Sequence, residues 1–417
     1  WIALTATANE QVRNDIVKQL GLKDGRMFLS SFNRPNLTYL VRPKQQWLKI
    51  AARALESVRG SSAIIYCSSR KETEKIAIKL TQNGYPALPY HAGLEDRVRR
   101  ETQEKFIRDE CPVIVATIAF GMGIDKPNVR LVIHTDLPRS IEGYYQETGR
   151  AGRDGLPSTC LFFFNPGDRW KREYFIRQIT DHEEQERSRK QVEDMVRYAQ
   201  IAHCRRKFLL GYFGENWNHP SCGSCDHCLG EEAEIYAPIS TKQETYDREL
   251  FEVLRILRKQ LADARRVPAF VIFGDRSLRE MARLYPQSQT SFRKIYGVGA
   301  EKAKTFGTTF IEVICAYAKT HDNKPDLTSP TVSSITSNTL SDTLSETKTH
   351  LQQKRSLKEM ASLRGLAEST ILNHLEKIAA RESVEMSHLY PDTERLNKIK
   401  DAFQASKGWM LTPVRER

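Results

Sequence analysis

Two arginines in the first half of the chain have the spacing of a pair that serves one anionic site. Residues 149–153 read Gly-Arg-Ala-Gly-Arg, which places Arg150 and Arg153 three positions apart with only small residues between them. Side chains three residues apart lie on one face of a helix, and small intervening residues let another surface come close. Two solvated arginines on a helix would also explain the string in isolation. The spacing favours cations directed at one shared anionic target.

Four cysteines form a second group with chemical potential. They follow the pattern C-x₁₇-C-x₂-C-x₂-C at Cys204, Cys222, Cys225 and Cys228. Thiolates two residues apart can share one tetrahedral ion at about 2.3 Å each, and the polar surroundings disfavour unligated buried thiols. His203, His219 and His227 could substitute as ligands, although four cysteines already close a structural site. The pattern predicts one structural Zn²⁺.

The residue pattern between about positions 35 and 165 indicates the scaffold that would position the arginines. Short apolar runs alternate there with helical stretches such as 71–82 and 94–109. The clearest apolar runs are 63–66, 113–116 and 131–133. Fully apolar short strands that alternate with helices predict a parallel α/β sheet with helices on both faces. Polar segments follow the three runs, at the strand ends where such sheets carry their working residues.

These polar segments resemble the motifs of RecQ-family DNA helicases, which are superfamily-two enzymes. Residues 145–155 resemble motif VI in its RecQ form, 117–125 motif V, 64–70 motif IV and 4–8 motif III, and 33–37 and 90–94 are similar to other RecQ strings. The resemblance covers roughly residues 1–320 and rests on several independent motifs. It implies a RecA-like motor domain that forms one wall of an ATP site.

The resemblance also assigns roles at that ATP site. Arg153 would be the arginine finger that reaches the γ-phosphate of ATP, and Arg150 and Gln146 would support the same cleft. A finger of this kind stabilises charge that develops in phosphoryl transfer and contributes about 10³–10⁵ in rate. Gly123 and Asp125 would join the nucleotide cleft from motif V.

Other motif residues would lie nearer a track for single-stranded DNA, namely Ser68, Arg70, His91 and Thr117.

The sequence contains neither a G-x-x-x-x-G-K-[ST] phosphate loop nor an Asp-Glu-x-His carboxylate pair for Mg²⁺. We therefore expect ATP and Mg²⁺ to bind between this chain and a first motor domain that it lacks. By itself the chain is expected to be an inactive fragment.

Residues 246–320 resemble the HRDC domain, an accessory module of the family. Residues 296–302 look like its glycine hairpin between two helices, which can offer backbone N–H groups to a phosphate. A plain helix–helix turn explains the string equally well, but Lys294, Lys302 and Lys304 favour DNA binding. Only residues 229–245 separate this unit from the zinc module, so we expect the winged-helix domain of many RecQ proteins to be absent.

The last part of the chain begins with a segment rich in Ser and Thr that cannot bury a core. Residues 356–375 then read as a helix, a glycine turn and a Ser-capped second helix, which fits a helix-turn-helix. A helical packing module without a DNA role is the alternative.

The predicted fold class is an α/β RecA-like parallel-sheet motor domain followed by a helical zinc-binding module and small all-α accessory domains. The expected divisions are a remnant of the first motor domain at 1–25, the second motor domain at 26–166, the zinc-binding module at 167–232, the HRDC domain at 244–321, a flexible linker at 322–349 and the helix-turn-helix-like domain at 350–417.

The net charge of +12, from 64 basic and 52 acidic residues, suits a polyanionic partner that releases counterions on binding. A protein that merely happens to be basic is the alternative. The sequence has no run of about 18 apolar residues that could span a membrane, so we expect no membrane partner. Since it shows no cationic-then-apolar leader either, we expect a cytoplasmic, nucleoid-associated location of the bacterial type.

The predicted function is an ATP-dependent 3′-to-5′ DNA helicase of the RecQ family in DNA repair and recombination. Expected partners are single-stranded DNA, branched or duplex junctions, single-strand-binding protein and other repair proteins. The rival hypothesis is a non-catalytic DNA-binding adaptor derived from a helicase. The complete motif VI argues against it, because an adaptor would not need Arg153.

Overall fold

The computed structural model describes residues 2–5, 7–22, 26–121, 124–230, 246–321, 347–364, 371–372, 374–375, 378 and 385–389. The chain divides into two compact units, residues 1–326 and 327–417. Gly123 lies outside the described residues.

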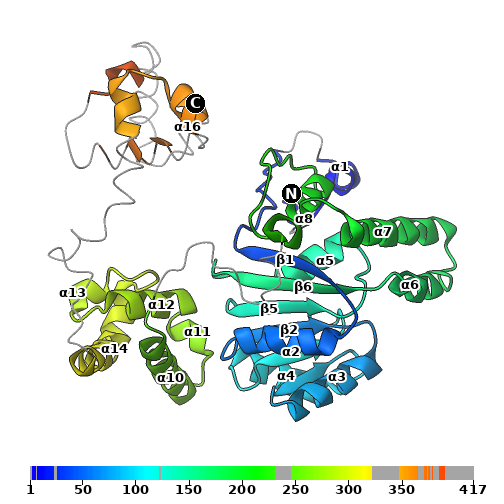
Figure 1. Ribbon diagram of the computed structural model, residues 1–417, viewed down its shortest axis with the longest axis horizontal. Coiled ribbons are helices and arrows are strands. Elements are labelled where there is room, and N and C mark those ends of the chain that lie inside the picture. Colours follow the sequence, from blue (N-terminus) through cyan, green and yellow to red (C-terminus); the bar gives the residue numbers. More distant parts are fainter. Residues whose placement is uncertain are drawn as a thin grey trace. The chain divides into compact units, whose positions relative to one another are not determined.

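The first unit is built on a six-stranded sheet (Figure 1) in the order β1-β6-β5-β2-β4-β3. Every paired neighbour is parallel. The strands are β1 (Leu37–Pro43), β2 (Ser62–Tyr66), β3 (Ala87–Tyr90), β4 (Val113–Ala116), β5 (Val129–His134) and β6 (Ser158–Phe164). The predicted parallel α/β sheet is confirmed, and the three runs at 63–66, 113–116 and 131–133 form β2, β4 and β5.

Helices cover both faces of this sheet (Figure 1), and each face has its own apolar core. One face packs against α5 (Ile141–Thr148), α7 (His182–Gln200) and α8 (Arg205–Tyr212). The opposite face packs against α2 (Trp47–Ser57) and α3 (Arg70–Gln82). Because the central strands are buried on both faces, they are largely apolar, with buried exceptions such as Arg130 and His134 on β5.

Hydroxyl caps fix where the helices after two central strands begin. The Ser69 hydroxyl accepts from the backbone N–H of Glu72 at 3.2 Å and starts α3. The Ser140 hydroxyl accepts from the N–H of Gly143 at 3.1 Å and starts α5. Such caps satisfy N–H groups that have no partner within the helix.

The first unit has further helices before β1, between β3 and β4, and after β6. They are α1 (Glu10–Gln19), α4 (Asp96–Ile107), α6 (Asp168–Ile176), α9 (Asp226–Leu229), α10 (Arg248–Arg265), α11 (Ala269–Ile272), α12 (Asp275–Leu284), α13 (Gln289–Phe292) and α14 (Ala300–Thr320). The last five form an all-α module around buried Phe273, Phe292 and Phe310. No helix among the described residues is long and apolar enough to cross a membrane.

In the second unit, a small apolar core joins Leu351, Met360, Ala361, Ile371 and Leu375. Its described elements are α16 (Leu357–Arg364) and a 3₁₀ turn at Ser387–Leu389. Residues 347–352 are also helical, so the predicted linker boundary at 349 falls inside a helix. The expected start of the second helix at 368–370, and most of the expected linker, lie outside the described residues.

Candidate functional site

Arg153 lies just beyond α5, where it contacts the segment that follows β4. Its guanidinium donates to the backbone carbonyl of Ile124 at 2.9 Å and to Asp125 Oδ1 at 2.6 Å. The side chains of Arg153 and Asp125 are 34% and 89% exposed. The predicted cleft residues Arg153 and Asp125 are therefore adjacent, and the arginine remains accessible to an anionic ligand.

Arg150 packs against the same segment, three residues earlier in the turn that follows α5. The two arginines therefore lie in a turn and not on the helix face that their spacing suggested. The Arg150 guanidinium donates to the carbonyl of Gly121. A Cβ at position 121 would lie 2.8 Å from Arg150 Nη2, so glycine leaves room for this contact. The two arginines thus hold the loop after β4 from two points.

Gln146 reaches back to the start of the chain. Its side-chain amide donates to Thr7 Oγ1 at 2.5 Å, across 139 positions of sequence. Thr7 belongs to the 4–8 string that resembles motif III. Two strings at opposite ends of the predicted motor sequence therefore meet at one place.

The structure explains why glycine stands at position 152, between the two arginines, for a reason that the sequence did not reveal. Gly152 has a φ of +56°, and a Cβ there would lie 2.4 Å from Asn36 Nδ2 and 2.8 Å from the Leu156 carbonyl. Asn36 donates to the Gly152 and Leu156 carbonyls at 2.8 and 2.9 Å. Glycine at 152 is thus required by the packing of the turn itself.

A buried histidine–glutamate pair joins α5 to β5. His134 Nε2 lies 2.6 Å from Glu147 Oε2, and His134 is 2% exposed. The Tyr66 hydroxyl donates to the Phe120 carbonyl at 2.9 Å, and burial raises the pKa of Tyr66 well above its ordinary value. These groups were not predicted, because each one looks like an ordinary strand or helix residue in the sequence.

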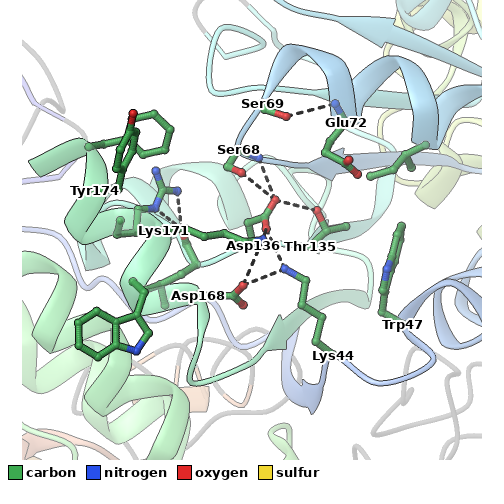
Figure 2. A pocket seen from close by; sticks show the side chains of 15 residues that line it. Lys44, Trp47, Ser68, Ser69, Glu72, Thr135, Asp136, Asp168, Lys171 and Tyr174 are labelled. Atoms are coloured by element: carbon green, nitrogen blue, oxygen red, sulfur yellow. Dashed lines mark hydrogen bonds and ion pairs between the residues drawn. The ribbon is translucent and has the colours of Figure 1, made fainter. Parts of the chain in front are cut away.

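A pocket of about 650 Å³ opens at the C-terminal ends of β2 and β5. Figure 2 shows Lys44 between the carboxylates of Asp136 and Asp168, at 2.8 and 3.0 Å. Asp136 Oδ2 also accepts from the N–H and the hydroxyl of Ser68, both at 3.0 Å. Burial alone would raise the pKa of Asp136, but the hydrogen bonds from Lys44 and Ser68 hold it well below its ordinary value.

The other residues assigned to a DNA track surround the ends of β2, β3 and β4. The guanidinium of Arg70 lies over Gly93, where a Cβ would approach Nη1 to 2.8 Å. His91 is 3% exposed, with Nε2 3.1 Å from Glu74 and Nδ1 accepting from the N–H of Gly93. Thr117 Oγ1 accepts from the N–H of Ala119 at 3.4 Å. Ser68, Arg70 and Thr117 lie close to strand ends. The His91 ring is enclosed and holds its own loop through the hydrogen bond from Gly93. The DNA-binding roles of these residues remain predictions.

The four predicted zinc ligands come together. The Sγ atoms of Cys204, Cys222, Cys225 and Cys228 all lie within 4.8 Å of one another. A tetrahedral ion with 2.3 Å bonds needs sulfurs roughly 3.8 Å apart, so four sulfurs this close together can share one ion. Backbone N–H groups of Lys207 and Cys222 each donate to a cluster sulfur at 3.4 Å, as suits thiolates. The donor set fits a structural Zn²⁺.

The predicted lysines of the all-α module lie on and around α14. Lys294 and Lys304 are exposed. Lys302 donates to the Val271 carbonyl at 2.8 Å, and burial lowers its pKa. Lys302 is thus a bridge within the module, in addition to its predicted part in DNA binding.

Family models match four consecutive stretches of the chain. They are the helicase conserved C-terminal domain at 46–155, the RecQ zinc-binding domain at 166–229, the HRDC domain at 247–314 and a helix-turn-helix domain at 343–417. The first contains Arg150 and Arg153, and the second contains all four cysteines.

Curated relatives match across these divisions. The ATP-dependent DNA helicase RecQ of Pasteurella multocida is 32% identical over 76% of this chain and 68% of its own length. The protein of the same name from Bacillus subtilis is 31% identical over 77% and 71%. The RecQ-like DNA helicase BLM of Xenopus laevis is 47% identical over 55% of this chain and 18% of its own length. A solved structure of Saccharomyces cerevisiae Dbp5 bound to RNA and ADP BeF3 covers 46% of this chain and 54% of its own at 18% identity, with a TM-score of 0.36.

Proposed function

The chain belongs to the RecQ family of DNA helicases, and we propose that it is the second-motor, zinc and accessory part of an ATP-dependent 3′-to-5′ helicase in DNA repair and recombination. The observation that carries this proposal is the convergence of Arg153, Arg150 and Gln146 with Asp125 and Thr7. A non-catalytic adaptor would have no use for an accessible arginine held in this way.

The residues of this wall have separate tasks in the proposed reaction. Asp125 and the Ile124 carbonyl hold the Arg153 guanidinium until a phosphate competes for it. Arg150 holds the loop after β4, and Gln146 fixes α5 against Thr7. ATP bound by the first motor domain would supply the γ-phosphoryl group whose developing charge Arg153 stabilises. Since the sequence contains no phosphate loop, the chain alone is expected to show no steady ATP turnover.

The zinc module and the strand ends would form the surface that contacts DNA. The four cysteines would hold Zn²⁺ in a closed, structural role. Ser68, Arg70 and Thr117 lie at the C-terminal strand ends, which is where open parallel sheets bind their ligands. Single-stranded DNA crossing this edge is the arrangement that we propose.

The test is Arg153→Ala in the full-length protein. We expect DNA-stimulated ATP turnover to fall at least 10³-fold while ATP binding changes little, because a finger acts on transition-state charge. Arg187→Ala is the matched control, since Arg187 is a 67% exposed arginine on α7 whose guanidinium pairs with nearby Glu184. Turnover within tenfold of wild type in the Arg153 variant would refute the assignment.

A further inference from the structure

A buried cluster of charged side chains joins the all-α HRDC module to the motor sheet. Arg258 on α10 and Asp275 at the start of α12 are 3% and 5% exposed, and Arg258 Nη1 donates to Asp275 Oδ1 at 2.9 Å. Arg130 on β5 is 2% exposed, and its Nη2 lies 3.4 Å from Asp275 Oδ2. Asp275 therefore stands between one arginine of its own module and one of the motor.

The same arginine of the motor also holds the turn that carries the predicted finger. Arg130 Nη1 donates to Asp154 Oδ1 at 2.9 Å, and its Nη2 contacts Asp154 Oδ2. Asp154 directly follows Arg153, and its Oδ1 also accepts from the N–H of Leu156 at 3.2 Å. The Arg130 guanidinium is thus shared between Asp154 of the turn and Asp275 of the accessory module.

Further contacts show that this junction is built of matched charges. Lys259 on α10 donates to the Arg108 carbonyl of the motor at 2.8 Å. The fully buried ammonium of Lys126 pairs with Asp109. Arg130 and Arg258 form one connected group with Asp154 and Asp275, which has two cations and two anions.

The buried charges at this junction depend on one another. A charged group is tolerated in the interior only when it is paired, and removing one partner leaves the others uncompensated. Burial alone would raise the pKa of Asp275, but Arg258 and Arg130 lower it below its ordinary value. The carboxylate is therefore charged at neutral pH, and Arg130 loses an anionic neighbour if Asp275 is removed or moves away.

We propose that Asp275 is a positioning residue for the ATPase site, which acts through Arg130 and Asp154 on the turn that carries Arg153. Docking of the HRDC module against β5 fixes the Arg130 guanidinium, and Arg130 then fixes the Asp154 carboxylate next to the finger. The accessory module in this way contributes to catalysis as well as to DNA binding. This inference rests on the proposed function, because the finger role of Arg153 is part of it.

The first test measures the turn itself and needs no ATP. Amide hydrogen exchange is compared between the 417-residue chain and its Asp275→Ala variant. We expect faster exchange across residues 150–156 in the variant, where Gly152 N–H donates to the Val129 carbonyl and Leu156 N–H to Asp154. Glu301→Ala, which removes an exposed carboxylate from the same module, should leave this exchange unchanged.

The second test measures turnover in the full-length protein. Asp275→Ala should lower kcat for ATP roughly threefold to tenfold with little change in KM, since a positioning defect acts in the transition state. If Asp275→Ala unfolds α10–α14, as their own exchange would reveal, Asp275→Asn decides, because it keeps the size and the hydrogen-bonding oxygen but removes the charge. Unchanged exchange at 150–156, or unchanged kcat, in a variant whose HRDC helices stay protected would overturn the inference. Absence of ATP turnover in the wild-type protein would instead overturn the proposed function, and the positioning role with it.

Discussion

At the scale of single residues, Lys44 and Asp136 form an ion pair of 2.8 Å that joins the ends of β1 and β5. Arg150 and Arg153 stand in a recognisable string, so their contacts with the loop after β4 could be anticipated. The pairing of Lys44 with Asp136 could not be anticipated, because the two residues are 92 positions apart and neither stands in a distinctive pattern. Their pairing follows from the parallel sheet, which brings the ends of β1 and β5 to one edge.

Asp136 gives a pH-dependent prediction. A carboxyl whose pKa is lower in the folded chain stabilises the fold above its unfolded value of about 3.9, and this stabilisation is lost as pH falls through the folded value. Since Asp136 has such a lowered pKa, Asp136→Asn should cost about 2 kcal/mol at pH 7, and this cost should shrink below about pH 4. Urea unfolding of both proteins between pH 3 and 7 measures the difference. Glu101→Gln, at an exposed i,i+4 pair with Arg97, is the control; a cost for Asp136→Asn that stays constant to pH 3 would contradict the prediction.

At the scale of elements, the zinc module completes the edge of the motor sheet. Strand β1 pairs with β6 on one side only. On its other side, Tyr39 N–H donates to the Ser224 carbonyl at 3.1 Å and Val41 N–H donates to Asp226 Oδ2 at 3.0 Å. Unpaired edge strands invite association with other chains, so the cysteine loop protects β1 as well as binding metal.

Loss of the metal should therefore affect the motor as well as its own module. We expect freshly purified protein to contain one Zn²⁺ per chain, and Cys225→Ser to lower stability by several kcal/mol, because structural zinc contributes folding free energy. Exposure of β1 should make this variant aggregate on mild heating. Metal analysis and light scattering measure the two effects. Cys315→Ser, at a half-buried cysteine outside the cluster, should retain zinc; a Cys225 variant with full zinc and normal solubility would refute the assignment.

The elements themselves were predicted unevenly, for physical reasons. Strands β2, β4 and β5 lie in the sheet interior, and each contains a run of at least three apolar residues, so their type was evident. Strand β3 has four residues, includes Pro89 and lies at the sheet edge, where proline is tolerated. The apolar run in β6 is equally compatible with a buried helix segment by periodicity alone. The HRDC contact with β5 had no sequence signal, since Asp275 and Arg130 resemble ordinary surface charges.

At the scale of the whole molecule, the order of the domains leaves no room for a winged helix between the zinc-binding and HRDC modules. The zinc-binding and HRDC family models leave only residues 230–246 between them, which is too short for a further domain. The winged helix that was expected to be absent has no room there. The C-terminal region, which matches a helix-turn-helix family model at 343–417, is a candidate for duplex contact.

We predict that residues 350–417 bind duplex DNA weakly and in a salt-dependent manner. Helix-turn-helix domains place the start of the second helix against base edges, and Glu368, Ser369 and Thr370 occupy that position in the sequence. Nearby cations that could hold phosphates are Lys354, Arg355, Lys358 and Arg364. Acidic Glu359, Glu368 and Glu376 dilute this charge, so affinity should be modest and should fall steeply with added salt.

Deletion of residues 350–417 from the full-length protein tests this role. DNA affinity should fall while ATP turnover at saturating DNA stays near that of the intact protein, because the ATPase residues lie in the other unit. Fluorescence anisotropy with a labelled duplex at low and moderate salt measures affinity, and a steady-state assay measures turnover. Replacing Lys358 and Arg364 by Ala should reproduce part of the affinity loss and reduce the slope of log affinity against log salt by roughly two. If the isolated tail shows no binding at low salt, and its deletion leaves DNA affinity unchanged, the region is a helical packing or protein-interaction module instead.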